Sequence, residues 1–141
     1  MLSFSIDAKT KKESVATSAL KEIMVSAMVF SSNYMFIGCY NGGFSQYKSK
    51  GFKREHFYGF PFDKKPIDKL SLSGDEMNVF VVSGSRIKQF CTEKHIQLFD
   101  IECTEDRPDG MITDIIQSHE FSLFITIDDQ LVIKKWEAIN V

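Results

Sequence analysis

The side chains best suited to chemistry in this sequence form two short groups. Cys91, Glu93 and His95 lie close together, and Asp128 and Asp129 are adjacent. A cysteine beside a histidine could act as a nucleophile, and paired carboxylates could divide acid and base roles. However, the sequence identifies no activating partner for the cysteine, and aspartates are common in hairpin turns because their carboxylates accept hydrogen bonds from nearby N–H groups. We therefore expect no catalytic residue, and a small β enzyme or ligand-binding domain built on these groups is the first alternative.

The cysteines and histidines do not fall at the spacings of metal sites or disulfide frameworks. The three cysteines, Cys39, Cys91 and Cys103, are odd in number and form no CxxC pair, and the three histidines are scattered. Buried free thiols in a reducing compartment are the simplest interpretation. The sequence thus predicts no metal ion and no cofactor.

An aromatic cluster that follows an arginine is the strongest candidate for a binding site. The cluster contains Phe57, Tyr58, Phe60 and Phe62, and Arg54 precedes it. Because successive side chains of a strand point to opposite faces, four aromatic residues in so short a segment cannot all face one core. Exposed aromatic residues beside arginine are typical of protein interfaces. We expect these five residues to bind a protein partner, although packing between strands would also explain aromatic residues here.

The same segment, residues 50–62, could instead stack single-stranded nucleic acid on its aromatic rings, with Lys50 and Lys53 near the phosphates. The chain carries 17 Lys and Arg against 19 Asp and Glu, a formal net charge of −2. Proteins that bind nucleic acid without sequence preference depend on clustered cations to neutralise phosphates. Nucleic-acid binding is therefore the second alternative, and a protein is the expected partner.

The composition is typical of a soluble globular chain. Its 141 residues are 43% hydrophobic and 26% charged, which suffices for one domain with a core. Thirteen phenylalanines against three prolines favour β structure. The N-terminus lacks the basic flank and apolar centre of a secretory signal, and no apolar run reaches the roughly 18 residues of a membrane span. We expect a cytoplasmic protein that does not contact a membrane.

Three segments of the chain repeat one pattern of short apolar strands and polar turns. Each copy opens at an isoleucine, and its third strand ends in an aromatic residue. The opening residues are Ile23, Ile67 and Ile112, and the closing aromatic residues are Tyr47, Phe90 and Trp136. The copies recur roughly every 45 residues, which is the period of a β-propeller blade.

The repeat predicts three strands in each copy and an outer strand after the first two copies. The predicted strands are residues 25–30, 34–40, 44–48, 52–58, 67–72, 78–83, 86–90, 96–102, 112–117, 122–127 and 131–136. Apolar residues between Ala16 and Met28 also fall at helical spacing. The equivalent segments of the other copies are too short and too rich in β-branched residues for a helix, so we expect a strand near Val25–Phe30.

These strands predict one partial propeller over residues 1–141. Residues 1–22 would contain an N-terminal strand, Leu2–Asp7, and a polar loop. The first blade would span residues 23–62, the second 63–107, and the third 108–141 without an outer strand. The predicted fold class is all-β, with about three blades of four antiparallel strands in an incomplete ring.

The pattern resembles the WD-repeat family, whose blades have four strands and whose third strand ends in a tryptophan followed by an acid. Trp136-Glu137 occupies that position, while Tyr47 and Phe90 replace the tryptophan in the other copies, and no Gly-His pair precedes the first strand of any copy. The resemblance implies a propeller that serves as a platform for binding proteins. It therefore implies a non-enzymatic role.

The number of blades raises the question of how the ring closes. Propellers usually contain four to eight blades, so about three blades leave open edges of unpaired backbone groups. The rest of a longer chain, a second copy or another subunit could cover these edges. We expect a scaffold or adaptor segment that mediates protein–protein interaction within a larger intracellular assembly.

Overall fold

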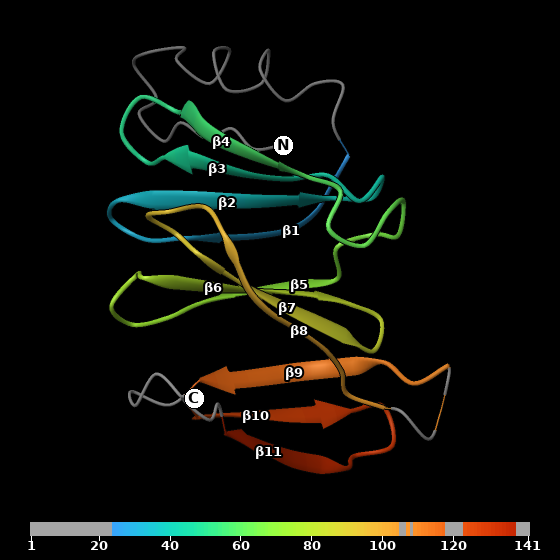
Figure 1. The fold of residues 1–141 in the computed structure, drawn as a ribbon. Helices are drawn as coiled ribbons and strands as arrows, with labels where there is room; N and C mark the ends of the chain where they lie inside the picture. The colour runs from blue at the N-terminus through green and yellow to red at the C-terminus, as the bar shows by residue number, and fades with distance from the viewer. Residues whose placement is uncertain (1–23, 105–106, 108, 118–122, 138–141) are drawn as a thin grey trace, which may run out of the picture.

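The computed structural model describes residues 24–104, 107, 109–117 and 123–137, and these form three antiparallel sheets (Figure 1). The first sheet contains β1 (Val25–Phe30), β2 (Tyr34–Cys39), β3 (Phe44–Lys48) and β4 (Lys53–Gly59). The second contains β5 (Lys69–Leu72), β6 (Asn78–Ser83), β7 (Arg86–Cys91) and β8 (Gln97–Glu102). The third contains β9 (Ile112–Gln117), β10 (Leu123–Asp128) and β11 (Ile133–Glu137). Within each sheet the strands lie side by side in chain order.

The structure confirms the predicted fold class, an all-β partial propeller of antiparallel blades. The segment with helical spacing is a strand where it is described, because Val25–Phe30 pairs with β2. The predicted N-terminal strand Leu2–Asp7 and the first repeat residue, Ile23, lie outside the described residues.

Several strands begin later than the sequence predicted, by one residue for β4 and β8 and by two residues for β5 and β11. The strand expected at Ile67 begins at Lys69. Ile67 is fully buried between the first two sheets, and its N–H donates a hydrogen bond to the carbonyl of Cys39 at 3.2 Å. Ile112 lies in the equivalent position between the next two sheets and donates to the carbonyl of Gly84 at 2.8 Å. These isoleucines therefore join one sheet to the next, which explains why the second and third copies open with one.

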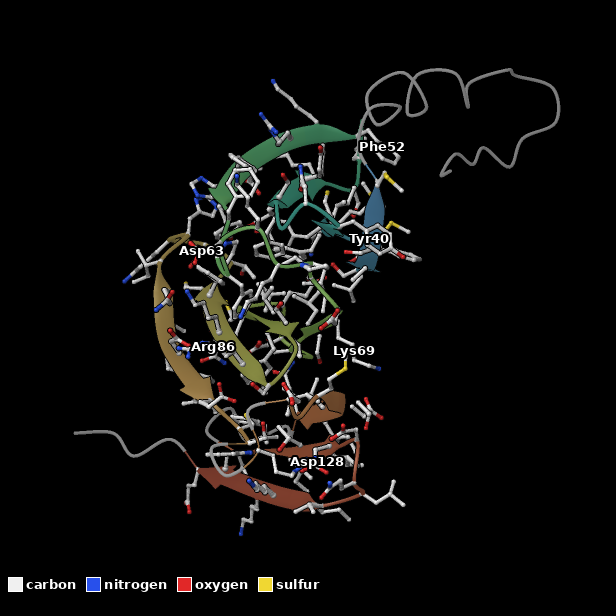
Figure 2. The ribbon with its side chains drawn as sticks, turned by 90° about the vertical axis from the view of Figure 1, so that its right-hand side faces the viewer. Tyr40, Phe52, Asp63, Lys69, Arg86 and Asp128 are labelled. Atoms are coloured by element: carbon white, nitrogen blue, oxygen red, sulfur yellow. The ribbon has the colours of Figure 1, made fainter. Side chains whose placement is uncertain are left out.

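The sheets follow one another along an arc, with their first strands on one side and their fourth strands on the other. Figure 2 shows β1, Lys69 of β5 and β9 along one side, and β4 and β8 along the opposite side. Contacts between β1 and β5 and between β5 and β9 join neighbouring sheets on the first side. This radial arrangement is that of propeller blades around an axis.

Two apolar clusters hold the sheets together. The first lies between the first and second sheets and consists of Phe36, Phe44, Phe62, Ile67, Val79, Val81 and Phe90. The second lies between the second and third sheets and consists of Phe80, Val82, Ile87, Cys103, Ile112, Ile115 and Phe124. Burying one such Phe, Val or Ile side chain stabilises the fold by about 1.5–3 kcal/mol relative to exposure. Face-to-face packing of successive sheets is therefore the main stabilising interaction.

The strand registers define which residues are equivalent in the three sheets. The residue pairs that flank the second hairpin of each sheet are Gly38 with Phe44, Val82 with Ile87, and Ile127 with Ile133. Two residues before Gly38, Val82 and Ile127 stand Phe36, Phe80 and Ile125. In the first two sheets these residues face the next sheet. Phe36, Phe80 and Val82 lie in the two apolar clusters, and Gly38 lies against Ile67. The repeat found in the sequence is thus also a repeat of side-chain orientation.

The close approach of the first two sheets at Gly38 generates a prediction. A Cβ atom at this position would lie 2.6 Å from Cβ of Ile67, whose side chain is fully buried. Gly38→Ala should therefore lower the free energy of unfolding by about 1–3 kcal/mol through overpacking. Urea unfolding followed by circular dichroism would measure the change.

Gly43→Ala is the matched control, because the nearest atom to its added Cβ is the side-chain oxygen of Asn41 at 3.2 Å. The control should unfold close to the wild-type midpoint. Equal midpoints for both variants would contradict the packing described here.

Candidate functional site

The five residues of the predicted binding cluster divide between the surface and the core. β4 pairs with β3 through two irregularities in register, so that Phe57 lies opposite Ser45 and Arg54 lies opposite Tyr47. Tyr58 instead packs with Phe44 and Phe90, in the first apolar cluster. Phe57 and Tyr58 are adjacent and point to opposite faces, and the irregularity between His56 and Arg54 places Arg54 on the face of Phe57.

Arg54, Phe57 and Phe60 form an exposed group that we call the rim cluster. The guanidinium carbon of Arg54 lies 5.3 Å from the ring centroid of Phe57, a cation–π geometry. The rings of Phe57 and Phe60 meet edge to face with centroids 5.7 Å apart, and they are 43% and 50% exposed. Gly43 lies against both rings, since a Cβ there would be 3.7 Å from each. The rim cluster is a preformed aromatic and cationic surface of the kind that protein interfaces use.

Phe62 is buried and Tyr58 is partly buried against the core, so both are less accessible to a partner than the rim cluster. The Tyr58 hydroxyl donates a hydrogen bond of 2.5 Å to the amide oxygen of Gln46, which is itself fully buried. Burial, with smaller effects of Cys91 and Glu55, raises the pKa of Tyr58, so the hydroxyl stays a donor. Phe62 is buried beneath the ammonium group of Lys88, which lies 5.2 Å from its ring centroid.

A stack of two histidines joins the first two sheets near β4. The rings of His56 and His95 are nearly parallel, with centroids 4.2 Å apart, and both contact Tyr58 edge to face. Burial and the neighbouring His95 lower the pKa of His56, while Glu55 opposes this effect. Sequence analysis missed this pair because nothing local in the sequence links a residue of β4 with the turn after β7.

His95, one of the residues considered for a catalytic role, makes contacts that stabilise the fold. The His95 imidazole stacks on His56, and its backbone N–H donates to the carbonyl of Cys91 at 2.9 Å. Two hollows in the described surface lie elsewhere. One is lined by residues that include Lys65, Arg86 and Glu102, and the other by residues that include Ser26, Lys69 and Asp114.

Asp128 and Asp129 hold the turn between β10 and β11 to Arg107. The Arg107 guanidinium lies 2.8 Å from Oδ2 of Asp128 and 3.0 Å from Oδ1 of Asp129. Burial alone would raise the pKa of Asp128, but hydrogen bonds from the N–H groups of Val132 and Gln130, together with Arg107, lower it overall. The hydrogen bond to Arg107 is the main cause of the lowered pKa of Asp129. The pair therefore fits the hairpin role expected of it.

Trp136, the closing aromatic residue of the third copy, makes a polar contact within its own sheet. Its indole N–H donates a hydrogen bond of 2.9 Å to the hydroxyl of Thr126 on β10, and its ring stacks on Phe124. The equivalent residues Tyr47 and Phe90 are buried in the first two sheets. The closing aromatic residues thus face the same way in all three sheets, as the repeat requires.

Two further features concern metals and membranes. The described residues contain no group of three or more His, Cys, Asp or Glu side chains placed to hold a metal ion. None of their elements is a helix long and apolar enough to cross a membrane.

Comparison with known proteins establishes the fold. No protein-family model and no curated protein matches the sequence. Among solved structures, the chain is similar to Chaetomium thermophilum Sqt1 bound to the N-terminus of the ribosomal protein L10, at 12% identity and a TM-score of 0.66 over 81% of this chain and 32% of that one. It is also similar to the WD40 repeats of RRP9, at 9% identity and a TM-score of 0.70 over 83% of this chain and 36% of that one.

These likenesses identify the fold as a WD-repeat-like partial propeller. The chain spans only about a third of the length of either structure.

The division of the predicted cluster can be tested by removing single hydroxyl groups. Tyr58→Phe leaves the buried amide oxygen of Gln46 without its donor and should lower the free energy of unfolding by about 1–2 kcal/mol. Tyr40→Phe, at a side chain that is 55% exposed, should change it by less than about 0.5 kcal/mol. Equal unfolding midpoints in urea for the two variants would show that Tyr58 is not a core residue.

The contacts of Arg107 predict a dependence of stability on pH. Because the pKa values of Asp128 and Asp129 are lowered in the folded state, their stabilising effect is complete above the ordinary carboxyl value of 3.8 and is lost as the pH falls through their folded values. Arg107→Gln should therefore lower the urea midpoint at pH 7. The difference from wild type should shrink progressively as the pH drops below 3.8. A difference that stays constant down to the acid unfolding transition would argue against the ion pairs.

Proposed function

We propose that this chain is a non-enzymatic protein-interaction segment, a scaffold or adaptor whose third sheet binds the protein that continues the propeller. The fold supports a platform for protein binding in general, and the surface of the third sheet supports the specific role. The partner would be the rest of a longer chain, a second copy or another subunit. Each of these would place the chain within a larger assembly.

The observation that carries this proposal is a difference in exposure between equivalent residues. Ile87 of the second sheet is fully buried against the third sheet, whereas its equivalent Ile133 is 67% exposed. Phe80 and Val82 are likewise buried, while their equivalents are partly exposed; these equivalents are Ile125 and Ile127. The third sheet therefore presents to solvent the same positions that the second sheet uses to bind its neighbour.

Together with two adjacent residues, these isoleucines form what we call the end face. It consists of Ile116, Leu123, Ile125, Ile127 and Ile133, from all three strands of the third sheet. Ile116 is 52% exposed and pairs with Ile125 across β9 and β10. Lys135 and Asp114 share this face, opposite Ile125 and Ile127, so charged residues border the aliphatic ones. The aliphatic part is stabilised when another apolar surface covers it, because water is released from both. A protein with an apolar sheet face of its own is the partner that this surface fits.

The rim cluster is the second surface in this proposal. Arg54 and Phe57 lie on β4 of the first sheet and Phe60 follows it, whereas the end face belongs to the third sheet, so the two surfaces would contact different parts of the assembly. Arg54 already covers one face of the Phe57 ring, which reduces the surface available for a stacked nucleotide base. A protein partner that supplies a carboxylate to Arg54 and an apolar side chain to Phe60 fits the cluster better.

The likeness to Sqt1 supports a protein as the class of partner, since that structure holds the N-terminus of a ribosomal protein. The free cysteines support the proposed cytoplasmic location. Cys39 and Cys103 are buried thiols, and burial raises the pKa of Cys103 to about 12. Such unreactive thiols suit a reducing compartment. The blade limits 23–62, 63–107 and 108–141 belong to the same proposal, as units that pack in series.

Replacing Ile133 by a charged residue tests the end face. Ile133→Lys should weaken association of the chain, with itself or with added partner, by roughly tenfold, because a charge would be desolvated in the apolar interface. Light scattering coupled to size-exclusion chromatography over a range of concentrations would measure association, and circular dichroism would confirm that the variant folds.

The matched control is Leu98→Lys on β8, an exposed aliphatic residue outside the end face. This variant should associate as the wild type does. A wild-type chain that remains a monomer at every concentration and binds no apolar dye would contradict the proposed role of the end face.

A further inference from the structure

We infer that the outer edge of β11 binds one extended strand of a partner protein, and that this strand carries a carboxylate opposite Lys134 between two apolar residues. The inference rests on the proposed function and specifies the partner's chemistry. It concerns the edge of the third sheet, whereas the association tested above concerns the face.

The first observation is an unpaired strand edge. In the first two sheets the third strand lies between two neighbours, because β3 pairs with β2 and β4, and β7 pairs with β6 and β8. Over the part of the third sheet that is described, β11 pairs on one side only, with β10. Figure 1 shows β11 at the end of the molecule opposite β4. Its outer N–H and C=O groups are therefore placed to accept a strand by backbone hydrogen bonds.

The second observation is a lysine that occupies the same position in two sheets. Lys88 of β7 and Lys134 of β11 are equivalent, since they pair with Val81 and Thr126 in matching registers. Lys88 donates a hydrogen bond to the carbonyl of Pro61, and Lys134 donates one of 2.7 Å to the carbonyl of Cys103. Both carbonyls belong to segments that follow the preceding sheet's fourth strand. The two lysines thus have the same orientation and the same first partner.

The second sheet shows what completes the surroundings of such a lysine. Asp100 of β8 lies opposite Lys88, with its carboxylate 3.9 Å from the ammonium group. Asp100 also accepts a hydrogen bond of 2.7 Å from Arg86. No residue of the described third sheet occupies the position opposite Lys134 on the outer side. Val132 stands in place of Arg86 in the third sheet, so a carboxylate there would form a cross-strand charge pair with Lys134 alone.

The residues that flank Asp100 define the apolar part of the pattern. Phe99 and Ile101 pair with Gln89 and Ile87 and pack against the second apolar cluster. The equivalent positions on β11 are Lys135 and Ile133. A strand added to β11 with the sequence pattern apolar–acid–apolar would therefore extend the end face with two further apolar side chains.

A partner protein is the source of the strand that best fits this pattern. Within this chain, Phe99-Asp100-Ile101 is already paired with β7. The predicted strand Leu2–Asp7 contains Phe4-Ser5-Ile6, which has the two apolar residues but a serine in place of the acid. It therefore offers no charge to Lys134, and the lysine favours a partner that supplies one.

Two synthetic peptides test the inference against the full chain. The first copies residues 96–102, and the second is the same peptide with Asp100→Lys. Fluorescence anisotropy should show that the first peptide binds about tenfold more tightly than the second, because only the first supplies a carboxylate to Lys134. On the Lys134→Glu variant the preference should reverse. Lys135→Glu is the matched control, since Lys135 lies on the opposite face of β11, and it should leave the sign of the preference unchanged.

Each outcome decides the matter. Equal binding of both peptides, or no binding of either, would overturn the inference. Tighter binding of a third peptide, residues 1–7, would also overturn it and assign the edge to the chain's own N-terminal segment. If Lys134→Glu fails to fold, the two peptides on the wild-type chain still give the charge preference. Association that depends on Ile133 while the peptides bind equally would leave the proposed function standing and reject only the added strand.

Discussion

The constraint on which this structure depends is that neighbouring sheets bury their apolar faces against one another. The side chains of Phe36 and Phe44 project from the first sheet and pack with Val79 and Phe90 of the second. The side chains of Phe80 and Ile87 project from the other face of the second sheet and pack with Phe124 of the third. No single sheet could be stable alone, because half of its apolar surface would face water. The fold therefore consists of sheets that pack in series. The proposed function is that a partner protein packs on the third sheet as the next member of this series.

Polar groups position the sheets without supplying most of the stability. Arg107 joins its loop to the aspartates of the last hairpin, and Lys88 and Lys134 each fasten a loop of the preceding sheet through a backbone carbonyl. Such exposed or partly exposed contacts contribute modestly in water. These contacts mainly orient the sheets, because each one fixes the position of a sheet relative to the loop of the preceding sheet. The lysine and its bond to a backbone carbonyl recur at Lys88 and Lys134, while the carboxylate beside Lys88 has no counterpart in the described third sheet, which is why the second sheet indicates what the third would accept.

Sequence reasoning succeeded for features that depend on neighbours in the chain. Strand rhythm and the period of the copies follow from local alternation and turn chemistry, and the structure confirms them. It succeeded only in part for the candidate site. Two irregularities of register between β3 and β4 decide which aromatic residues face outward, and such irregularities arise from pairing with another strand. Phe62 is buried and Tyr58 packs against the core, while Arg54, Phe57 and Phe60 are exposed, and the binding role of the cluster stays a prediction.

The sequence by itself determined the class of fold and its repeating unit, because the apolar alternation that defines a strand is written in consecutive residues. Only the tertiary structure decided which residues meet across the sheets: His56 with His95, Arg107 with Asp128, and Ile133 with no residue of the described chain on its outer side. These relations depend on how far one sheet is rotated against the next, and rotation is set by the packing of many side chains at once. The physical reason is that packing is a property of the assembled interface, which no local pattern contains.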